Sequence, residues 1–457
     1  MRIILGDVYS SIENCPLEAL ADIKSLTKAR PEGYLYMPKY KSGQWDGYIS
    51  LMRGMSIPTG LLGNGAIQQI ASKHGCSVKC VYSSNVHKVS VSCDVCADTL
   101  QGVTLRDYQL NAVMELLKRE RGVAKMATNS GKTVVIAALI KALGNADALV
   151  IVQSKELLYQ TSDRLAEMLG VPVGLIGDSH RHFESVNVAT IQTLNSMKRE
   201  IGTRFGHNRV LAVDECHHLS SSVAFDIIMK IPGWHRYGLS GTPLRCDKLR
   251  DLELIAATGP VAVDISNTYL IKHGWSAVPE IYITKIKDNS AYNLPYPRAY
   301  QQCIVESEQR NAVIAKLAAD SVDNGPVLVI VTRIDHGTML SQMIPGSIFL
   351  CGETDIEERM KTLRRMAQGD KIVVVATNIF DEGVDVPALN TLILAGGGKS
   401  YIKLLQRLGR GMRRKESGDN RFAVYDFYDD TNKYLRRHSE SRIETYRAEQ
   451  FDVKYIN

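Results

Sequence analysis

One short segment carries the residue types that hold a polyphosphate. Residues 127–133 read ATNSGKT; an apolar run beginning at Gly122 leads into them, and the helical pattern VVIAALIKAL follows. Backbone N–H groups at such a helix start attract phosphate oxygens, and we expect the lysine to reach the β- and γ-phosphates and the threonine hydroxyl to ligate Mg²⁺. The usual pattern starts with glycine where this chain has Met126, so a chance match before an ordinary helix is the alternative. The expected phosphate-binding residues are Asn129, Ser130, Gly131, Lys132 and Thr133.

Two adjacent acids follow another apolar run. Val210–Val213 leads into Asp214 and Glu215. Adjacent carboxylates after a buried strand are costly unless a cation or a partner satisfies them, which favours function over packing. We expect Asp214 to hold Mg²⁺, directly or through water, and Glu215 to orient and polarise the water that attacks a nucleoside triphosphate. His217 either contacts the γ-phosphate side or is a structural hydrogen-bonding group.

A third set of residues lies far along the chain. Gln406, Arg410 and Arg413 share one face of an expected helix by i, i+4 and i, i+3 spacing. Arginines supplied from a second domain stabilise the charge on a transferring phosphoryl group, an effect worth about 10³–10⁵ in rate. The alternative is a basic nucleic-acid face, and both can hold because different sides of one helix can do each job. We therefore expect hydrolysis in a cleft between two halves of the chain.

Alternating strands and helices must position these residues. The runs ALVIV, NVATI and VLAVD alternate with helical stretches in the first half, and VLVIV, SIFLC, KIVVVAT, TLILA and FAVYDF do so in the second. This pattern predicts an α/β protein with parallel sheets covered on both faces. The expected organisation is an N-terminal α+β domain (1–99), a first α/β domain (100–263), a hinge or connector (264–300), a second α/β domain (301–429) and a basic C-terminal helix (430–457).

The order of these motifs, from about Val103 to Asp429, resembles the superfamily 2 DExH helicase core, which has two RecA-like domains. The resemblance rests on ATNSGKT, DECH, SGTP and QRLGRGMRR, with LRDYQ, VQSKELLYQ, VATIQTL, IVTRIDHG and ATNIFDEGVDVP in register. It implies an ATP-driven nucleic-acid motor. By this match Arg106, Gln109, Gly383 and Asp385 lie near the nucleotide, His217, Ser240 and Thr242 couple hydrolysis to movement, and Ser154, Thr190, Arg333 and Thr377 contact nucleic acid.

The N-terminal region interleaves cations with aromatic rings. Lys39, Lys41 and Trp45 belong to this pattern, in which cations engage phosphates and rings stack on exposed bases or sugars. The alternative is a small sheet with aromatic side chains in its core. The segments PKYKSGQWDGYISL and IPTGLL resemble the N-terminal domain of phage branch-migration helicases of the UvsW type. That resemblance implies recognition of branched DNA, such as forks, displaced-strand loops and four-way junctions.

Cysteine usage and composition set weaker limits. Cys76, Cys80, Cys93 and Cys96 come near zinc-ribbon spacing, but two of them lie in strand-like runs, so ordinary thiols are the favoured interpretation. Nine cysteines scattered through the chain predict reduced thiols and a cytoplasmic location, in the host if the chain is phage-encoded. The net charge of +6 permits nucleic-acid binding. No apolar run long enough to span a membrane and no signal peptide are visible.

Our leading hypothesis is an ATP- and Mg²⁺-dependent DNA helicase that unwinds or branch-migrates forked and junction DNA in replication, recombination and repair. We expect it to act as a monomer, with other recombination or replication proteins as further partners. The alternatives are an RNA helicase, the motor subunit of a restriction complex, and an annealing or binding protein with a DNA-stimulated ATPase. Asp288–Arg298 is a candidate strand-separating element or an ordinary connector, and the tail after Asp430 either guides DNA or packs on the second domain.

Overall fold

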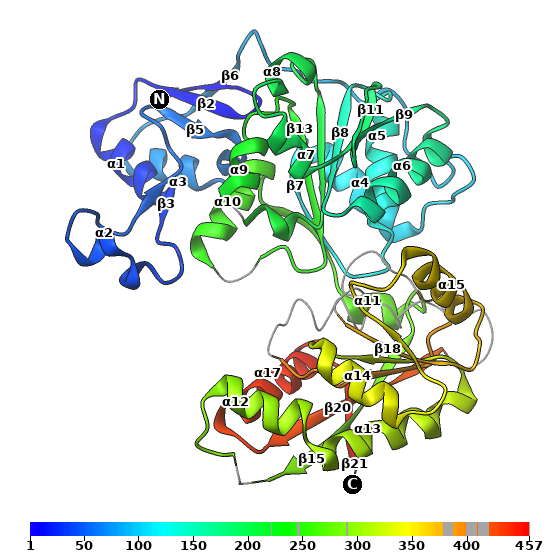
Figure 1. Cartoon of the computed structure of the whole chain (residues 1–457). Coiled ribbons are helices and arrows are strands. Elements are labelled where there is room, and N and C mark those ends of the chain that lie inside the picture. Colours follow the sequence, from blue (N-terminus) through cyan, green and yellow to red (C-terminus); the bar gives the residue numbers. More distant parts are fainter. Residues whose placement is uncertain are drawn as a thin grey trace. The chain divides into compact units, whose positions relative to one another are not determined.

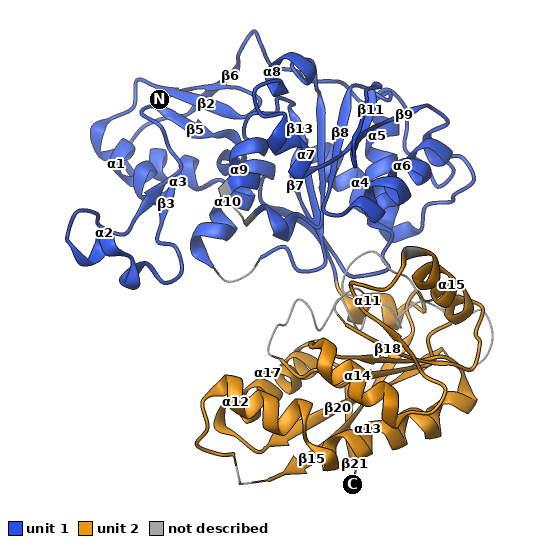
Figure 2. Cartoon of the chain, viewed as in Figure 1, with its two compact units in different colours: residues 1–265 blue, residues 266–457 orange. Residues whose placement is uncertain are grey.

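The computed structural model divides into two compact units, Met1–Ile265 and Ser266–Asn457 (Figure 2). In the part of the chain that is described, no helix is long and apolar enough to cross a membrane. The described residues are 1–220, 222–244, 247–288, 291–377, 386, 388–398, 409 and 420–456.

Unit 1 begins with a small four-stranded sheet in the order β5-β2-β1-β6. Strand β1 pairs antiparallel with β2 and parallel with β6, and helices α1 and α3 pack beside one another. Strands β3 and β4 form a separate two-stranded ribbon, and the short helix α2 lies between them in the sequence. The elements are β1 (Arg2–Leu5), β2 (Tyr9–Glu13), α1 (Leu17–Leu26), β3 (Lys28–Ala29), α2 (Pro38–Lys41), β4 (Ile49–Ser50), β5 (Ser56–Pro58), α3 (Ala66–Lys73) and β6 (Lys79–Tyr82).

The main sheet of unit 1 has eight strands in the order β10-β9-β11-β8-β12-β13-β7-β14. All neighbouring pairs are parallel except β10 with β9. The strands are β7 (Arg121–Met126), β8 (Ala148–Val152), β9 (Val173–Gly177), β10 (His180–His182), β11 (Val186–Thr190), β12 (Val210–Asp214), β13 (His235–Ser240) and β14 (Val261–Ile265).

Helices cover both faces of this sheet. Helices α4, α5 and α6 pack together on one face, and α9 and α10 lie on the other (Figure 1). Strands β8 and β12 are buried at every residue, which explains why their sequences are continuous apolar runs. The helices are α4 (Asp107–Arg119), α5 (Lys132–Ala142), α6 (Lys155–Leu169), α7 (Ile191–Ser196), α8 (Ile201–Arg204), α9 (Ser222–Ile228) and α10 (Lys248–Thr258).

Buried polar contacts attach the N-terminal sheet to the start of β7 and β13. Arg121 Nη2 donates to the Asp7 carbonyl at 3.1 Å and to the Trp234 carbonyl at 2.9 Å. The Asp7 carboxylate accepts from the backbone N–H groups of His87 at 3.0 Å and Gly233 at 3.4 Å. These hydrogen bonds make the N-terminal sheet part of unit 1.

Unit 2 is built on a seven-stranded sheet in the order β17-β18-β16-β19-β20-β15-β21, and all its neighbouring pairs are parallel. The strands are β15 (Val278–Lys287), β16 (Val327–Ile330), β17 (Ile348–Leu350), β18 (Val373–Ala376), β19 (Thr391–Leu394), β20 (Arg421–Asp430) and β21 (Asp452–Ile456). The helices are α11 (Asn267–Lys272), α12 (Tyr296–Tyr300), α13 (Glu308–Ser321), α14 (Ile334–Met343), α15 (Ile356–Ala367) and α17 (Lys433–Ala448), with a π-helical turn at Gln301–Val305.

Alternate strand residues form two cores in unit 2. Leu328 and Ile330 of β16 pack in one apolar cluster with Ile443 and Tyr446 of α17. Val327 and Val329 face the other way and pack with residues of α13 and α14. The predicted two-faced burial of parallel strands is therefore present in this unit.

Two stretches differ from the predicted organisation. Residues 264–300, expected to be a hinge or connector, contain β15, which lies between β20 and β21 in the second sheet. The predicted C-terminal helix is present as α17, but the chain continues into β21, which pairs with β15. Polar residues alternate with apolar ones in VPEIYITKIK and DVKYI, so neither segment shows the continuous apolar run used to identify parallel strands.

Candidate nucleotide and nucleic-acid sites

The loop between β7 and α5 has the backbone shape of a phosphate-binding turn. Asn129 and Gly131 adopt φ angles of 68° and 81°, and α5 begins at Lys132. The φ angle of Gly131 favours glycine, and a Cβ atom there would lie 2.3 Å from Gln109 Nε2 and displace that amide. The first backbone N–H groups of α5 are directed along the helix start, where a phosphate gains most from them.

The start of α4 braces this loop. Gln109 Nε2 donates to the Ser130 carbonyl at 2.7 Å, and the Tyr108 hydroxyl donates to the same oxygen at 3.0 Å. Arg106 Nη1 lies 2.9 Å from the Tyr108 hydroxyl, and its backbone N–H donates to Gln109 Oε1 at 3.0 Å. The sequence interpretation named Arg106 and Gln109 but missed Tyr108, because a tyrosine on the buried face of a helix looks like ordinary core.

Lys132 and the acid pair meet at the end of β12. Lys132 Nζ is hydrogen-bonded to Glu215 Oε1. Burial would raise the pKa of Glu215, but Lys132 and a hydrogen bond from His217 outweigh it and hold that pKa well below its usual range. Burial also opposes the charge of Lys132, yet Glu215 and Asp214 raise the pKa of the lysine. Lysine and glutamate are therefore both charged in this site.

His217 and the SGTP segment extend the same network. His217 Nδ1 lies 2.7 Å from Ser240 Oγ and 3.3 Å from Glu215 Oε2. Ser240 Oγ donates to Glu215 Oε2 at 3.3 Å and accepts from the Thr242 backbone N–H at 3.1 Å. His217 and Ser240 are buried. Residues predicted to couple hydrolysis to movement thus contact the predicted water-orienting carboxylate directly.

The donor set beside this network fits a hard divalent cation. Asp214 is buried, and burial together with the charge of Glu215 raises its pKa to about 6. A cation would offset that unfavourable carboxylate pair, and carboxylate and hydroxyl oxygens are ligands that Mg²⁺ accepts. Ser130 Oγ is buried and has no hydrogen-bond partner among the described residues, as expected of a site shaped for a further polar group.

The predicted nucleic-acid contacts of unit 1 lie where parallel strands end. Ser154 follows β8 and caps α6, accepting a hydrogen bond from the Leu157 N–H at 3.3 Å. Thr190 ends β11 and caps α7, with its Oγ1 3.4 Å from the Thr193 N–H. Thr190 is buried. Both hydroxyls are thus engaged in helix capping, beside backbone groups at the same sheet edge.

The predicted contacts of unit 2 occupy the corresponding edge of its sheet. Arg333 precedes α14, and Thr377 follows β18, where its backbone N–H donates to the Leu350 carbonyl at 3.1 Å. Strands β16 and β18 are neighbours and run parallel, so their following loops emerge at one edge. Arg333 is half-buried and Thr377 is buried.

The N-terminal cations lie over tyrosine rings on the surface. Lys39 and Lys41 are exposed, Trp45 is half-buried, and Lys41 Nζ lies 5.8 Å from the Tyr36 ring centre. Tyr36 is 78% exposed, so it does not form the core of a small sheet. A nearby groove of about 870 Å³ is lined by residues that include Lys28, Arg30, Tyr34, Tyr48 and Lys248.

Several predictions concern other parts of the chain. Among the described residues, no group of three or more His, Cys, Asp or Glu side chains is arranged to hold a metal ion, the cysteines of the zinc-like pattern included. The candidate strand-separating segment is anchored, because Asn432 Nδ2 donates to the carbonyls of Ala291, Tyr292 and Leu294 at 2.7–3.1 Å. Gly383, Asp385, Gln406, Arg410 and Arg413 lie outside the described residues.

The C-terminal tail contains a buried arginine that packs on the second domain. Arg442 of this tail is buried and paired with Asp426 at 2.9 Å. Its Nη1 also donates to the Gly398 carbonyl at 2.7 Å. Arg442 therefore holds α17 against the second sheet, which agrees with the alternative of a helix packed on the domain.

Comparisons with known proteins agree with this architecture. The family model for the type III restriction enzyme res subunit matches residues 102–245, and the model for the helicase conserved C-terminal domain matches residues 308–415. The chain is 26% identical to the ATP-dependent DNA helicase uvsW of Enterobacteria phage T4, over 97% of each protein. It is 27% identical to the DNA 3'-5' translocase XPB2 of Sulfurisphaera tokodaii, over 69% of this chain and 80% of that protein.

A solved structure supports the fold. A variant of Saccharomyces cerevisiae Dbp5, bound to RNA and ADP–BeF₃, superposes with a TM-score of 0.58 at 15% identity, over 78% of this chain and 90% of that one. The predicted fold class is confirmed: an α/β chain with two RecA-like parallel-sheet domains and a small N-terminal sheet. The chain belongs to the superfamily 2 helicases, is related to the UvsW helicase of phage T4, and is an ATP-dependent enzyme.

Proposed function

We propose that this enzyme is a DNA helicase or translocase that remodels branched DNA, by unwinding or branch-migrating forks and junctions in replication, recombination and repair. The observation that carries the motor assignment is the network of Lys132, Glu215, His217 and Ser240, which joins three motifs in one site. The DNA assignment is supported by the T4 relative, a named DNA helicase that matches over 97% of both chains.

The network implies how ATP would be used. Lys132 is paired with Glu215 in this structure, so phosphate oxygens at the start of α5 would take over the lysine and release one carboxylate oxygen. His217 and Ser240 hold the other oxygen, Oε2, and keep the carboxylate oriented while Oε1 accepts a proton from the attacking water. Thr133 and Asp214 would hold Mg²⁺, which neutralises phosphate charge when bound.

The remaining roles rest on the family resemblance and on position. Residues at the strand ends of both large sheets would contact the DNA backbone, and the surface cations and rings of the N-terminal region would recognise the branch. The arginine segment would stabilise charge on the transferring phosphoryl group. The proposed DNA contacts are Ser154, Thr190, Arg333, Thr377, Lys39, Lys41 and Trp45, and the proposed phosphoryl contacts are Gln406, Arg410 and Arg413.

Strand displacement on synthetic forks and four-way junctions tests this function. The wild type should separate or migrate the strands only with ATP, and Lys132→Ala should lose that activity while it still binds DNA within a few-fold of wild type. Lys118→Ala removes an exposed lysine from α4 and serves as the matched control, with wild-type activity expected. ATP-independent strand exchange that survives in Lys132→Ala would instead support an annealing protein.

A further inference from the structure

Two residues outside every recognised motif hold Arg333 in place. The guanidinium of Arg333 lies 5.0 Å from the centre of the Tyr300 ring, and Arg333 Nη1 donates a hydrogen bond to Gln301 Oε1. Tyr300 ends α12 and Gln301 begins the π-helical turn, so one short segment supplies both contacts. π-helical turns are rare and frequently occur at functional sites.

These partners orient the charge of Arg333 without cancelling it. Among the described residues, no carboxylate lies within 4.0 Å of its nitrogens. Two other arginines of the same unit, Arg310 and Arg442, are buried and paired with Asp429 and Asp426. A guanidinium held by a neutral amide and an aromatic face is not neutralised within the protein, so its positive charge can attract a bound anion. Its planar set of N–H donors matches the spacing of phosphate oxygens.

The amide of Gln301 has only one orientation that satisfies its neighbours. Its Nε2 donates to Glu306 Oε1 at 2.8 Å and lies 3.5 Å from Asp335 Oδ2. Because an amide nitrogen only donates, the two carboxylates fix the NH₂ end, and the oxygen must face Arg333. Gln301 therefore separates the arginine from nearby acids while it aligns the guanidinium.

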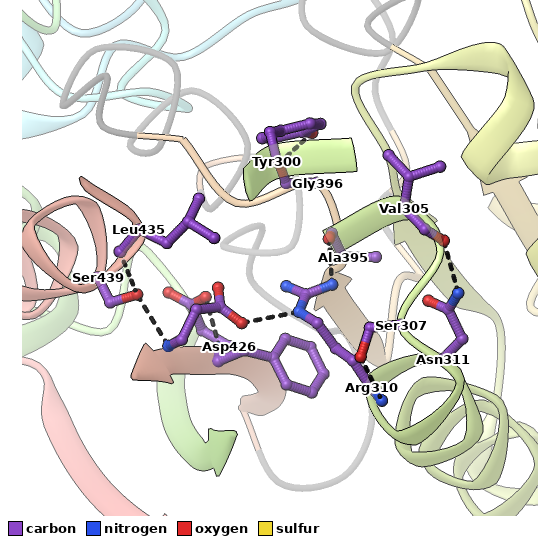
Figure 3. Close-up of polar contacts among 12 residues, drawn as sticks. Tyr300, Val305, Ser307, Arg310, Asn311, Ala395, Gly396, Asp426, Leu435 and Ser439 are labelled. Carbon is purple, nitrogen blue, oxygen red and sulfur yellow. Dashed lines mark hydrogen bonds and ion pairs between the residues drawn. The ribbon is translucent and has the colours of Figure 1, made fainter. Parts of the chain in front are cut away.

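Tyr300 connects Arg333 to the loop after the neighbouring strand. The Tyr300 hydroxyl donates to the Gly396 carbonyl at 2.7 Å (Figure 3). The backbone N–H of Gly396 donates to the Ile330 carbonyl at 2.9 Å, and a Cβ on this glycine would lie 2.5 Å from Thr332 Oγ1. One tyrosine thus braces two loops at the carboxyl edge of adjacent parallel strands, β16 and β19.

We propose that Tyr300 and Gln301 are positioning residues that hold Arg333 for a phosphate of the bound DNA strand. This inference rests on the proposed function, in which Arg333 contacts DNA. Each phosphate neutralised by a protein cation adds about one unit to the salt dependence of binding. Loss of the brace should therefore weaken the dependence of DNA affinity on salt as well as the affinity itself.

The positioning role of Tyr300 and Gln301 can be tested by ATP turnover. Turnover is measured as a function of DNA concentration at several salt concentrations. Gln301→Ala should raise the DNA concentration for half-maximal stimulation about 5–10-fold, the size of one typical net hydrogen bond. Tyr300→Phe keeps the ring over Arg333 and should cost about two-fold, while Tyr300→Leu should cost more. DNA-free turnover and the KM for ATP should not change. Gln302→Ala, at an exposed neighbouring glutamine, is the matched control.

A double-mutant cycle separates positioning from general structure. If Gln301 acts through Arg333, Gln301→Ala should add nothing in an Arg333→Ala background. An equal loss in both backgrounds, no loss in the single variant, or the same loss in Gln302→Ala would overturn the inference. If Arg333→Ala alone leaves DNA affinity unchanged, the inference fails while DNA-stimulated turnover by the wild type still supports the helicase. If the wild type is not stimulated by DNA, both fail.

Discussion

The carboxyl edges of the two large sheets differ in how a cationic side chain is held: one is paired with a carboxylate, and the other contacts neutral groups. In unit 1, Lys132 is paired with Glu215, whose other oxygen is held by His217 and Ser240. In unit 2, Arg333 is held by a neutral amide and a ring. The first site can exchange an internal partner for a ligand, which suits a step that binds and hydrolyses ATP. The second keeps an oriented cation, which suits continuous contact with a phosphate backbone.

The difference shows that the scaffold does not decide the chemistry. Both edges are made by parallel strands followed by loops and helices, and the same arrangement carries the proposed catalytic network in one unit and the proposed anchoring cation in the other. The buried arginines of unit 2 extend the contrast. Arg310 donates to the Asp429 carboxylate at 2.8 Å. It also donates to the Ala395 carbonyl at 2.6 Å and therefore stabilises the fold (Figure 3).

The substitution with the largest expected effect changes the hydrogen-bonded network of unit 1. Glu215→Gln keeps the shape of the side chain but cannot accept a proton from water, so kcat for ATP should fall by about 10²–10⁴. The KM for ATP should stay within a few-fold, because Lys132 and the phosphate loop remain. Steady-state ATPase assays measure both constants. Glu156→Gln, at an exposed position of α6, should behave as wild type, and near-normal turnover by Glu215→Gln would refute the role.

A second prediction separates structural arginines from the oriented one. Asp426→Ala removes the acid that pairs with buried Arg442 and accepts from the Tyr446 hydroxyl at 2.7 Å. An uncompensated buried charge should lower the free energy of unfolding by about 3–5 kcal/mol. The exposed pair of Asp370 with Arg365 is the control, and Asp370→Ala should cost about 0–1 kcal/mol. Urea unfolding measures both changes, and equal losses would contradict the distinction.

The link between hydrolysis and movement gives a smaller effect. Ser240→Ala removes the hydroxyl shared by His217, Glu215 and the Thr242 N–H. Loss of these hydrogen bonds should reduce ATP turnover by about 3–10-fold. Strand displacement should fall further, because the same serine ends β13 and directly precedes the loop that holds Thr242. The two rates are measured on one forked substrate, and a fall in strand displacement no larger than the fall in turnover would argue against coupling.

The sequence predicted the strands whose residues form continuous apolar runs. ALVIV and VLVIV are the buried strands β8 and β16. HRYGLS was not recognised as a strand, yet β13 is fully buried. Its Arg236 donates to the carbonyls of Ala257, Ile231 and Ile228 at 2.6–2.9 Å. Carbonyls from distant helix ends accommodate this cation, and no local pattern reveals such a site.

The candidate site likewise contains residues that the sequence motifs identified and residues that they did not. Motif order placed Lys132, Glu215 and Ser240 in one site, and the structure brings them together because all three lie at or just beyond the carboxyl ends of strands in one parallel sheet. It did not find Tyr108 or Gln301, whose roles depend on neighbours brought together by folding. A tyrosine or glutamine within a helical pattern has the appearance of core or surface, and only its hydrogen-bond partners show otherwise.

A further prediction concerns the pH dependence of the stability of unit 2. Burial, with the charge of Arg310, lowers the pKa of His336 to about 3. Below about pH 6.5 the unfolded chain binds a proton at His336 and the folded chain does not. The contribution of this histidine to the free energy of unfolding is therefore fully present above that pH. It is lost as the pH falls toward 3, by at most about 1.4 kcal/mol per pH unit. His336→Phe should flatten the decline measured by urea unfolding between pH 7 and 5. Identical slopes in both proteins would exclude this histidine as the cause.

ATP turnover by the wild type with different nucleic acids tests the central claim most directly. The panel contains no nucleic acid, single-stranded DNA, duplex DNA, a fork, a four-way junction and matched RNAs. We expect DNA to stimulate hydrolysis, with forks or junctions above single strands and duplex. Stimulation by RNA alone, or by none of these substrates, would contradict the proposal of a motor that acts on branched DNA.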